Sequence, residues 1–156
     1  MTNTASRHII DADLVLLDVD AGADKQSVIG RLVGSLADAG RTADAEGLIA
    51  AAMAREEQSA TGLPGGIAIP HCRSLVVNRL RVAFGRKKSG VDFKAIDEKP
   101  VNFFFLIVAP PLEVSNQYLP VLGKIAQFSK EADIPQRLNE LTEPKQFLAL
   151  LEEKGV

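Results

Sequence analysis

The apolar run at residues 103–108, Phe-Phe-Phe-Leu-Ile-Val, is the feature that most constrains the fold. A strand formed by this run is apolar on both faces, and such a strand has to be covered on both sides. We therefore expect residues 101–108 to form the central strand of a sheet with helices on each face. Pro110 and Pro111 should end the strand, because proline has no N–H to donate to a sheet ladder.

The rest of the chain alternates β-type runs with amphipathic segments. Residues 14–19 and 80–85 are β-type, whereas residues 25–39 and the segment after Thr42 space their apolar side chains by three and four, which predicts a helical hairpin. Asp24 and Thr42 are the expected N-caps. Three more helices are predicted, at residues 119–128, around residues 134–141 and from Pro144 onward. This order indicates a single α/β domain over residues 1–156, with a mixed β-sheet sandwiched between helical layers.

Composition excludes several classes of function. The net charge of −2, with 46% apolar and 24% charged residues, gives no reason to expect nucleic acid or an anionic membrane as a partner. Cys72 is the single cysteine, so an internal disulfide is impossible. Residues 1–8 lack the apolar segment of a signal peptide, and the longest apolar run is far shorter than the roughly 20 residues of a membrane-spanning helix. We expect a cytoplasmic protein that does not insert into a membrane.

His71 is the residue best placed for chemistry. It follows the short apolar run 67–69, which reads as a buried strand, and Pro70, which should stop regular sheet pairing there. A neutral imidazole is a good nitrogen nucleophile at physiological pH, because its ordinary pKa lies near 6.5. Taken alone, a histidine at a strand end is more often structural than nucleophilic, so the surrounding sequence has to decide.

Other chemical readings of the same residues are weaker. Cys72 adjoins His71, but neighbouring side chains on extended backbone point to opposite faces, which argues against a thiol–imidazole dyad. His8, His71 and Cys72 do not have the spacing of metal ligands. The spacing therefore gives no reason to expect a metal site. The chain has no Gly-x-x-x-x-Gly-Lys-Ser/Thr loop for nucleotide phosphates. The basic residues between 73 and 88 are expected to be solvated or to meet acidic patches on a partner.

The segment 55–73, Arg-Glu-Glu-Gln-Ser-Ala-Thr-Gly-Leu-Pro-Gly-Gly-Ile-Ala-Ile-Pro-His-Cys-Arg, resembles a known active site. It is similar to that of the type-2 enzyme IIA domains of the bacterial phosphoenolpyruvate:sugar phosphotransferase system, which include the fructose and mannitol enzymes. Further blocks match in the family's order at residues 90–93, 96–97, 99–101 and 118–126. The resemblance therefore covers nearly the full chain.

The resemblance implies a phosphoryl carrier, a protein-histidine phosphotransferase without metal or nucleotide. His71 would take phosphate from the carrier HPr and pass it to the enzyme IIB domain of a sugar permease. At the end of the second helix, Arg55 is the expected stabiliser of the phosphoryl oxygens, although a helix-terminal arginine may also serve the helix dipole alone. The Thr61 hydroxyl could add a donor. Glu56 could orient Arg55 or be solvated.

Two residues depart from the family pattern. Cys72 stands where a glycine is common, so the backbone after His71 must do without positive φ. Tyr118 stands where the family commonly has a second histidine beside the active one. We hypothesise that the Tyr118 hydroxyl supports the phosphohistidine, although it cannot carry a positive charge.

Three functions remain open at this point. The leading one is a carrier that feeds a fructose-type permease. The second is a nitrogen-related regulatory enzyme IIA that binds other proteins according to its phosphorylation state. The third is a binding domain that has lost activity. The resemblance does not identify the sugar, because enzyme IIA never touches it.

Overall fold

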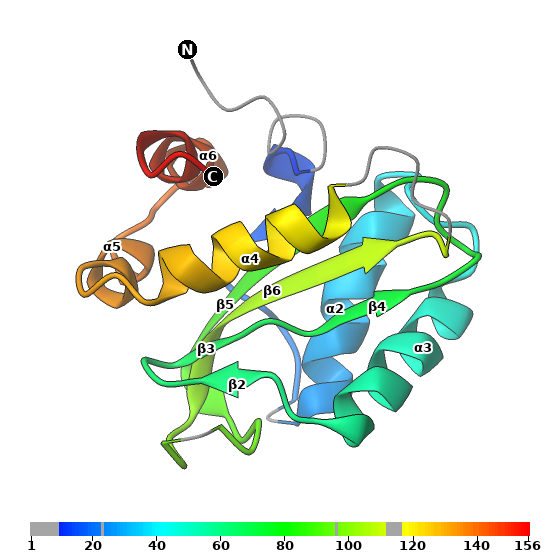
Figure 1. The fold of residues 1–156 in the computed structure, drawn as a ribbon, viewed down its shortest axis with the longest axis horizontal. Helices are drawn as coiled ribbons and strands as arrows, with labels where there is room; N and C mark the ends of the chain where they lie inside the picture. Colours follow the sequence, from blue (N-terminus) through cyan, green and yellow to red (C-terminus); the bar gives the residue numbers. More distant parts are fainter. Residues whose placement is uncertain (1–9, 23, 96, 112–116) are drawn as a thin grey trace.

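The computed structural model describes residues 10–22, 24–95, 97–111 and 117–156 (Figure 1). The elements in chain order are η1 (Ala12–Leu14), β1 (Val15–Leu16), α2 (Lys25–Asp38), α3 (Ala45–Gln58), β2 (Gly62–Leu63), β3 (Ile67–Ala68), β4 (His71–Arg73), β5 (Arg81–Val91), β6 (Val101–Ala109), α4 (Tyr118–Ser129), α5 (Ile134–Asn139) and α6 (Pro144–Glu153). None of the described helices is long and apolar enough to cross a membrane.

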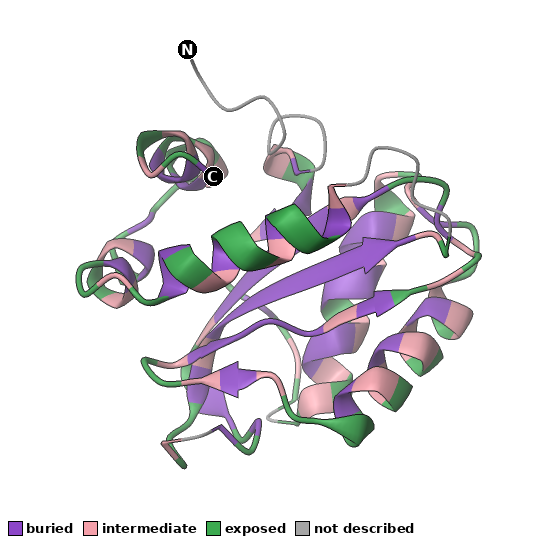
Figure 2. Ribbon diagram, in the orientation of Figure 1, coloured by how far each residue is buried: buried purple, intermediate pink, exposed green. Residues whose placement is uncertain are grey.

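β6 is the central strand, as its doubly apolar sequence predicts. It pairs antiparallel with β5 on one side and parallel with β3 and β4 on the other. β1 adds to β5 in parallel and β2 adds to β3 antiparallel, which makes a mixed sheet of six strands. Residues 103–109 are all buried, and Figure 2 shows β6 as a continuous buried band across the molecule.

Helices cover both faces of this sheet, which confirms the predicted sandwich. On one face the Phe105 ring contacts Phe128 of α4 and Phe147 of α6, at centroid distances of 6.0 Å each. On the other face α2 approaches β5 so closely that a Cβ on Gly85 would lie 2.8 Å from a Leu32 methyl group. Figure 1 shows α4 crossing the sheet on the side opposite α2. A side chain at position 85 would therefore force these layers apart.

The predicted helical hairpin is confirmed as α2 and α3, with one correction. Asp24 caps α2 by accepting from the Ser27 N–H, and Gly40 ends it at φ +73°. Thr42 was the expected cap of the second helix, but this prediction is wrong. Asp44 caps α3, accepting from the Gly47 N–H at 2.9 Å. The Thr42 hydroxyl instead donates to the Val76 carbonyl at 2.8 Å, which ties the hairpin to the β4–β5 connection.

Two strands differ from their predicted extents. The first β-type run forms only a 3₁₀ turn and the two residues of β1, and β5 extends to Val91 with a register irregularity after Arg86. Sheet pairing was expected to stop at Pro70, yet β4 resumes it at His71. The reason is that proline lacks an N–H but keeps its carbonyl, and the Pro70 carbonyl accepts from the Ile107 N–H at 3.0 Å.

The basic segment between residues 73 and 88 is not uniformly solvated. Arg86 is buried, and its guanidinium donates to the carbonyls of Leu17, Leu138 and Leu141 at 2.8, 2.9 and 2.8 Å. Arg86 can be buried because its planar guanidinium has five N–H donors, which together satisfy several backbone carbonyls that end near one another. Arg86 thereby links β1, β5 and the connection between α5 and α6.

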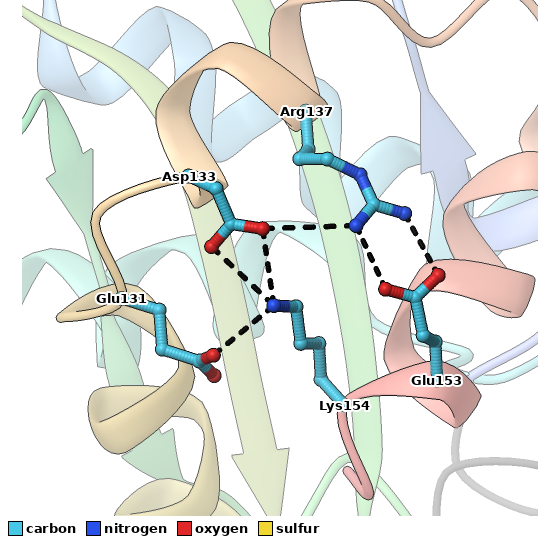
Figure 3. A network of polar contacts seen from close by, with 5 residues as sticks. All are labelled: Glu131, Asp133, Arg137, Glu153 and Lys154. Carbon is cyan, nitrogen blue, oxygen red and sulfur yellow. Dashed lines mark hydrogen bonds and ion pairs between the residues drawn. The ribbon is translucent and has the colours of Figure 1, made fainter.

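The two C-terminal helices are also joined by ion pairs on the surface (Figure 3). Arg137 of α5 binds Glu153 of α6 through two N–H···O contacts of 2.7 and 2.9 Å. Lys154 reaches Glu131 and Asp133 at 3.1 Å each. Residues separated by about twenty positions in the sequence therefore hold α5 and α6 in a fixed relation.

Candidate active site

His71 lies at the edge of the sheet, on the first residue of β4. This strand pairs with β6 on one side, and α3 lies along its other side (Figure 1). His71 pairs with Ile107 of β6. Ile107 is two residues from Phe105 and therefore shares its face of the sheet, so the His71 side chain also projects on the face that α4 covers. Tyr118, the first residue of α4, lies there, with its ring centroid 6.5 Å from that of His71. The imidazole is partly exposed and not sealed in the core.

Hydrogen bonds distinguish the two ring nitrogens of His71. Nδ1 lies 2.8 Å from the Ile69 carbonyl, which can only accept a hydrogen bond, so this contact assigns the proton to Nδ1. Nε2 lies 3.2 Å from Nη2 of Arg55, a group that can only donate. The two contacts select one neutral tautomer, with the lone pair on Nε2. Of the two ring nitrogens, Nε2 is therefore the one with an available lone pair.

Arg55 reaches the imidazole from the last turn of α3. Its Nη1 donates to the Ser59 carbonyl at 3.2 Å, just beyond the end of the helix, and Nη2 faces His71. The guanidinium is thus held by the segment that follows the helix as well as by the histidine. Arg55 is a candidate site residue from the sequence, and the structure brings it to the His71 imidazole.

The Thr61 side chain is engaged by Glu56. Its hydroxyl donates to one carboxylate oxygen at 2.6 Å, and its N–H donates to the other at 2.9 Å. Lys25 of α2 donates to the same carboxylate at 3.0 Å, and the Glu56 side chain is only 2% exposed. The Thr61 proton is therefore engaged in this conformation. Glu56 is neither solvated nor bonded to Arg55; it joins α2, α3 and the loop before β2.

Tyr118 and Arg73 form the other wall of the site. The Arg73 guanidinium carbon lies 4.3 Å from the centroid of the Tyr118 ring, a cation–π geometry. Arg73 Nη1 also donates to the carbonyls of Pro110 and Pro111 at 3.2 and 3.4 Å. Burial raises the pKa of Tyr118, so its hydroxyl stays protonated near neutral pH. The two-residue period of a strand puts the Arg73 side chain on the same face as His71.

Cys72 points into the core, as the alternation of an extended strand predicts. It is buried, and desolvation raises the pKa of its thiol to about 11. Among the described residues other than glycine, positive φ occurs only at Lys94 and Glu98. The backbone after His71 is thus extended, a conformation open to any residue, and cysteine at this position causes no strain.

The N–H groups of Gly65 and Gly66 lie too far from His71 to bind a phosphoryl group there. Their turn precedes β3, in which Ile67 pairs with Phe103 of β6. Phe103 is four positions along β6 from Ile107, the residue that pairs with His71. Four residues of strand span about 13 Å. Two exposed apolar side chains follow elements of the site: Leu75 lies two residues beyond β4, and Leu119 is next to Tyr118. Within the described ranges, no group of three His, Cys, Asp or Glu residues is arranged to hold a metal ion.

Comparison with known proteins agrees with this geometry. Residues 8–154 match the family described as phosphoenolpyruvate-dependent sugar phosphotransferase system, EIIA 2. The chain belongs to this EIIA family. It is accordingly a component of a protein-histidine phosphotransferase, and relatives of two kinds resemble it to a similar degree.

Fructose-specific EIIA proteins are one kind. This EIIA chain is 33% identical to the fructose-specific EIIA component of Haloferax volcanii over 132 residues, which cover 85% of this chain and 84% of the relative. It is 35% identical over 117 residues to the fructose-specific EIIABC component of Bacillus subtilis, covering 75% of this chain but only 18% of that longer protein.

Nitrogen regulatory proteins are the other kind. That of Pseudomonas aeruginosa is 32% identical over 117 residues, 75% of each chain. The crystal structure of IIA-Ntr from Neisseria meningitidis superposes with a TM-score of 0.83 at 27% identity, covering 92% of this chain and 97% of that one. IIA mannitol from Escherichia coli shares the fold, with a TM-score of 0.74 at 23% identity over 91% of this chain and 98% of that one.

Proposed function

We propose that this chain accepts a phosphoryl group from HPr on Nε2 of His71 and passes it to the enzyme IIB component of a fructose-type permease. The observation that carries the proposal is the partly exposed imidazole with a protonated Nδ1 and a guanidinium facing Nε2. The fructose-specific relatives at 33 and 35% identity support the choice of permease. A solved complex of enzyme IIAMtl with phosphorylated enzyme IIBMtl from Escherichia coli contains the same fold and suggests the acceptor.

The transfer itself needs positioning and charge stabilisation more than covalent work from the protein. The Nε2 lone pair forms the new N–P bond while the N–P bond of the donor phosphohistidine breaks, and the electron pair of that bond returns to the donor nitrogen. The Nδ1 proton stays on the ring and remains bonded to the Ile69 carbonyl. Arg55 gives up its contact with Nε2 and donates to the phosphoryl oxygens, which are stronger acceptors.

Tyr118 and Thr61 complete the proposed site. The Tyr118 hydroxyl is proposed as a neutral donor to a phosphoryl oxygen, consistent with its place beside His71 and its protonated state. Thr61 can donate to phosphate only when its bond to Glu56 breaks. In the resting state it acts instead as an anchor for the loop that leads to His71.

HPr and enzyme IIB are proposed to use one surface in turn, since both must reach Nε2. Leu75 and Leu119, exposed by 88 and 68%, give that surface apolar contacts. Transient encounters of this kind bury less than about 1,200 Å², which a shallow apolar rim provides.

Regulation is the second candidate function. Identity to the Pseudomonas aeruginosa nitrogen regulatory protein is 32%, close to the values for the fructose relatives, and the Neisseria meningitidis structure superposes closely. A regulator would use the same phosphorylation of His71 to change its affinity for another protein.

Reconstitution of the phosphoryl relay tests both functions. The purified chain is incubated with labelled phosphoenolpyruvate, enzyme I and HPr, then with fructose-type enzyme IIB and sugar. A carrier acquires acid-labile label on His71 and loses it to enzyme IIB, while His71→Ala acquires none. Label that stays on His71 with every enzyme IIB supplied favours the regulator. An intact chain that HPr cannot label contradicts both.

A further inference from the structure

Arg73 is a cation beside the nucleophile that the proposed chemistry has not yet used. It follows His71 by two residues in β4, so both side chains project from the same face of the strand. Tyr118 contacts both: its ring centroid is 6.5 Å from the His71 centroid and 4.3 Å from the Arg73 guanidinium carbon. The side chains of His71, Tyr118 and Arg73 therefore form one cluster.

The observed contacts of Arg73 hold it only weakly. Its side chain is exposed, and within the part of the chain that the structure describes its hydrogen bonds go to the neutral carbonyls of Pro110 and Pro111 at 3.2 and 3.4 Å. Exposed cation–π contacts are individually weak. A doubly negative phosphoryl group is a much stronger acceptor for a guanidinium than a carbonyl or a ring face. Arg73 is therefore free to exchange these partners when phosphate arrives.

Two arginines act electrostatically on the Tyr118 hydroxyl. Burial raises the pKa of Tyr118, while the positive charges of Arg73 and Arg55 act in the opposite direction. Both guanidiniums are thus within electrostatic range of Tyr118, Arg55 from α3 and Arg73 from β4. The common second histidine of the family can carry a positive charge, whereas Tyr118 cannot. Arg73 supplies a positive charge at this wall of the site.

We propose that Arg73 is a second phosphoryl-binding guanidinium, which rests on the Tyr118 ring while His71 is unmodified and moves onto the phosphoryl oxygens when Nε2 is phosphorylated. This inference rests on the proposed phosphorylation of His71 and adds a catalytic residue to it. Arg55 and Arg73 would then hold the phosphoryl group from opposite sides.

A purely structural role predicts different behaviour. Arg73 could instead only fix the backbone after β6 through Pro110 and Pro111. In that case its removal would lower the melting temperature and would leave the kinetics of the folded protein unchanged.

The test compares rates of labelling by phospho-HPr for four single variants and one double variant, all assayed well below their melting temperatures. We expect Arg73→Met to lower the rate constant for transfer about tenfold or more, the usual effect of losing one charge-assisted hydrogen bond. Arg73→Lys should recover part of it. Lys88→Met is the matched control. It removes an exposed charge from the end of β5 that lies far from His71, and it should keep the wild-type rate. Tyr118→Phe keeps the ring on which Arg73 rests, so the Arg73→Met effect should persist in the double variant.

NMR of the Arg73 side chain supplies the second measurement. Its Nε–H resonance should carry a ring-current shift from Tyr118 in the unmodified protein and lose that shift on phosphorylation. Wild-type rates in folded Arg73→Met, or an unmoved resonance in fully phosphorylated protein, would overturn the inference. Failure of phospho-HPr to label even the wild-type chain would instead overturn the proposed function, so the two failures are distinguishable.

Discussion

One backbone carbonyl decides which nitrogen of His71 is available for reaction. The Ile69 carbonyl holds the Nδ1 proton, and Arg55 then meets the lone pair of Nε2. Both partners are fixed by chain geometry: Ile69 lies two residues before His71, and Arg55 occupies the end of a helix packed beside β4. The arrangement orients the imidazole before any partner arrives, so little orientational entropy remains to be lost during transfer.

Replacing Arg55 tests this preorganisation. We expect Arg55→Met to lower the rate of phosphoryl transfer to His71 roughly 10- to 100-fold, because a charge-assisted hydrogen bond to the phosphoryl group is lost. The rate of labelling by phospho-HPr measures it. Arg31→Met, on the exposed side of α2, removes the same charge away from the site and serves as control. Equal rates for the two variants would show that Arg55 serves only the end of its helix.

Cys72 illustrates how a reactive residue type can be made inert by its surroundings. Burial raises the pKa of its thiol to about 11, so at pH 7.5 the thiolate is on the order of one part in a thousand or less. We expect iodoacetamide to modify the folded protein slowly and the urea-unfolded protein rapidly, as followed by mass spectrometry. The rate in the folded state should rise with pH up to that pKa. Rapid modification of the native protein at neutral pH would contradict the buried orientation.

At the scale of elements, the contacts of Glu56 join the α2–α3 hairpin to the loop that enters the site. Lys25, from the first turn of α2, is the charged partner of this buried carboxylate, and Thr61 satisfies its remaining acceptors. Removing one partner of a buried pair leaves an uncompensated charge, which costs more than removing both.

This asymmetry gives a double-mutant prediction. Lys25→Met should lower the free energy of unfolding by roughly 1–3 kcal/mol, since the Glu56 carboxylate loses its charged partner. Glu56→Gln in the same chain should recover part of the loss, because a neutral amide tolerates the site without a cation. Urea unfolding of the wild type, both single variants and the double variant measures the coupling. Strictly additive effects would mean that the ion pair contributes nothing.

The sequence predicts elements best where periodicity is strong. The run at residues 103–108 identified the central strand, and the spacing of apolar residues located α2 and α4 to within two residues. Thr42 and Asp44 are both good capping residues, and only tertiary contact decided between them, because the Val76 carbonyl engages the Thr42 hydroxyl. Likewise, pairing of β4 after Pro70 depends on β6 as neighbour, which no local pattern reveals.

In the candidate site, too, local patterns were predictive and tertiary contacts were not. The resemblance selected His71, Arg55, Thr61 and Tyr118, and the structure brings Arg55 and Tyr118 to the imidazole while turning Thr61 toward Glu56. Arg73 was accessible to simple reasoning, since strand alternation places it beside His71. The role of Glu56 could not be predicted in this way, because its partner Lys25 lies 31 residues away in the sequence.

At the scale of the whole molecule, charged residues connect the C-terminal helices to the rest of the chain in two different ways. Arg86 does so from within the core, donating to carbonyls of the segment after β1 and of the α5–α6 connection. The network in Figure 3 does so at the surface, where Arg137, Lys154 and their acidic partners join α5 to α6. Only the second connection is open to solvent, so only it should respond directly to pH and salt.

The pKa values of the acidic partners fix the pH range of that response. Contact with Lys154 lowers the pKa of Asp133 below its ordinary 3.8, and contact with Arg137 lowers that of Glu153 below 4.5. A lowered carboxyl pKa means that the stabilisation is complete above these ordinary values and is lost as the pH falls through the lowered ones. The pKa values of Arg137 and Lys154 are raised, so the basic partners keep their charge throughout the neutral and acid range.

Amide hydrogen exchange in α6 should report this network, since surface ion pairs act locally and contribute little to global stability. We expect Glu153→Gln to speed exchange in α6 at pH 6–7, and the difference from wild type to shrink as the pH falls through the lowered pKa of Glu153, where the wild-type carboxyl also loses its charge. High salt should reduce the difference at neutral pH by screening. Glu57→Gln, an exposed change on α3, is the control and should leave α6 unaffected. A difference that persists at pH 2 would assign the effect to packing of α6 and not to charge.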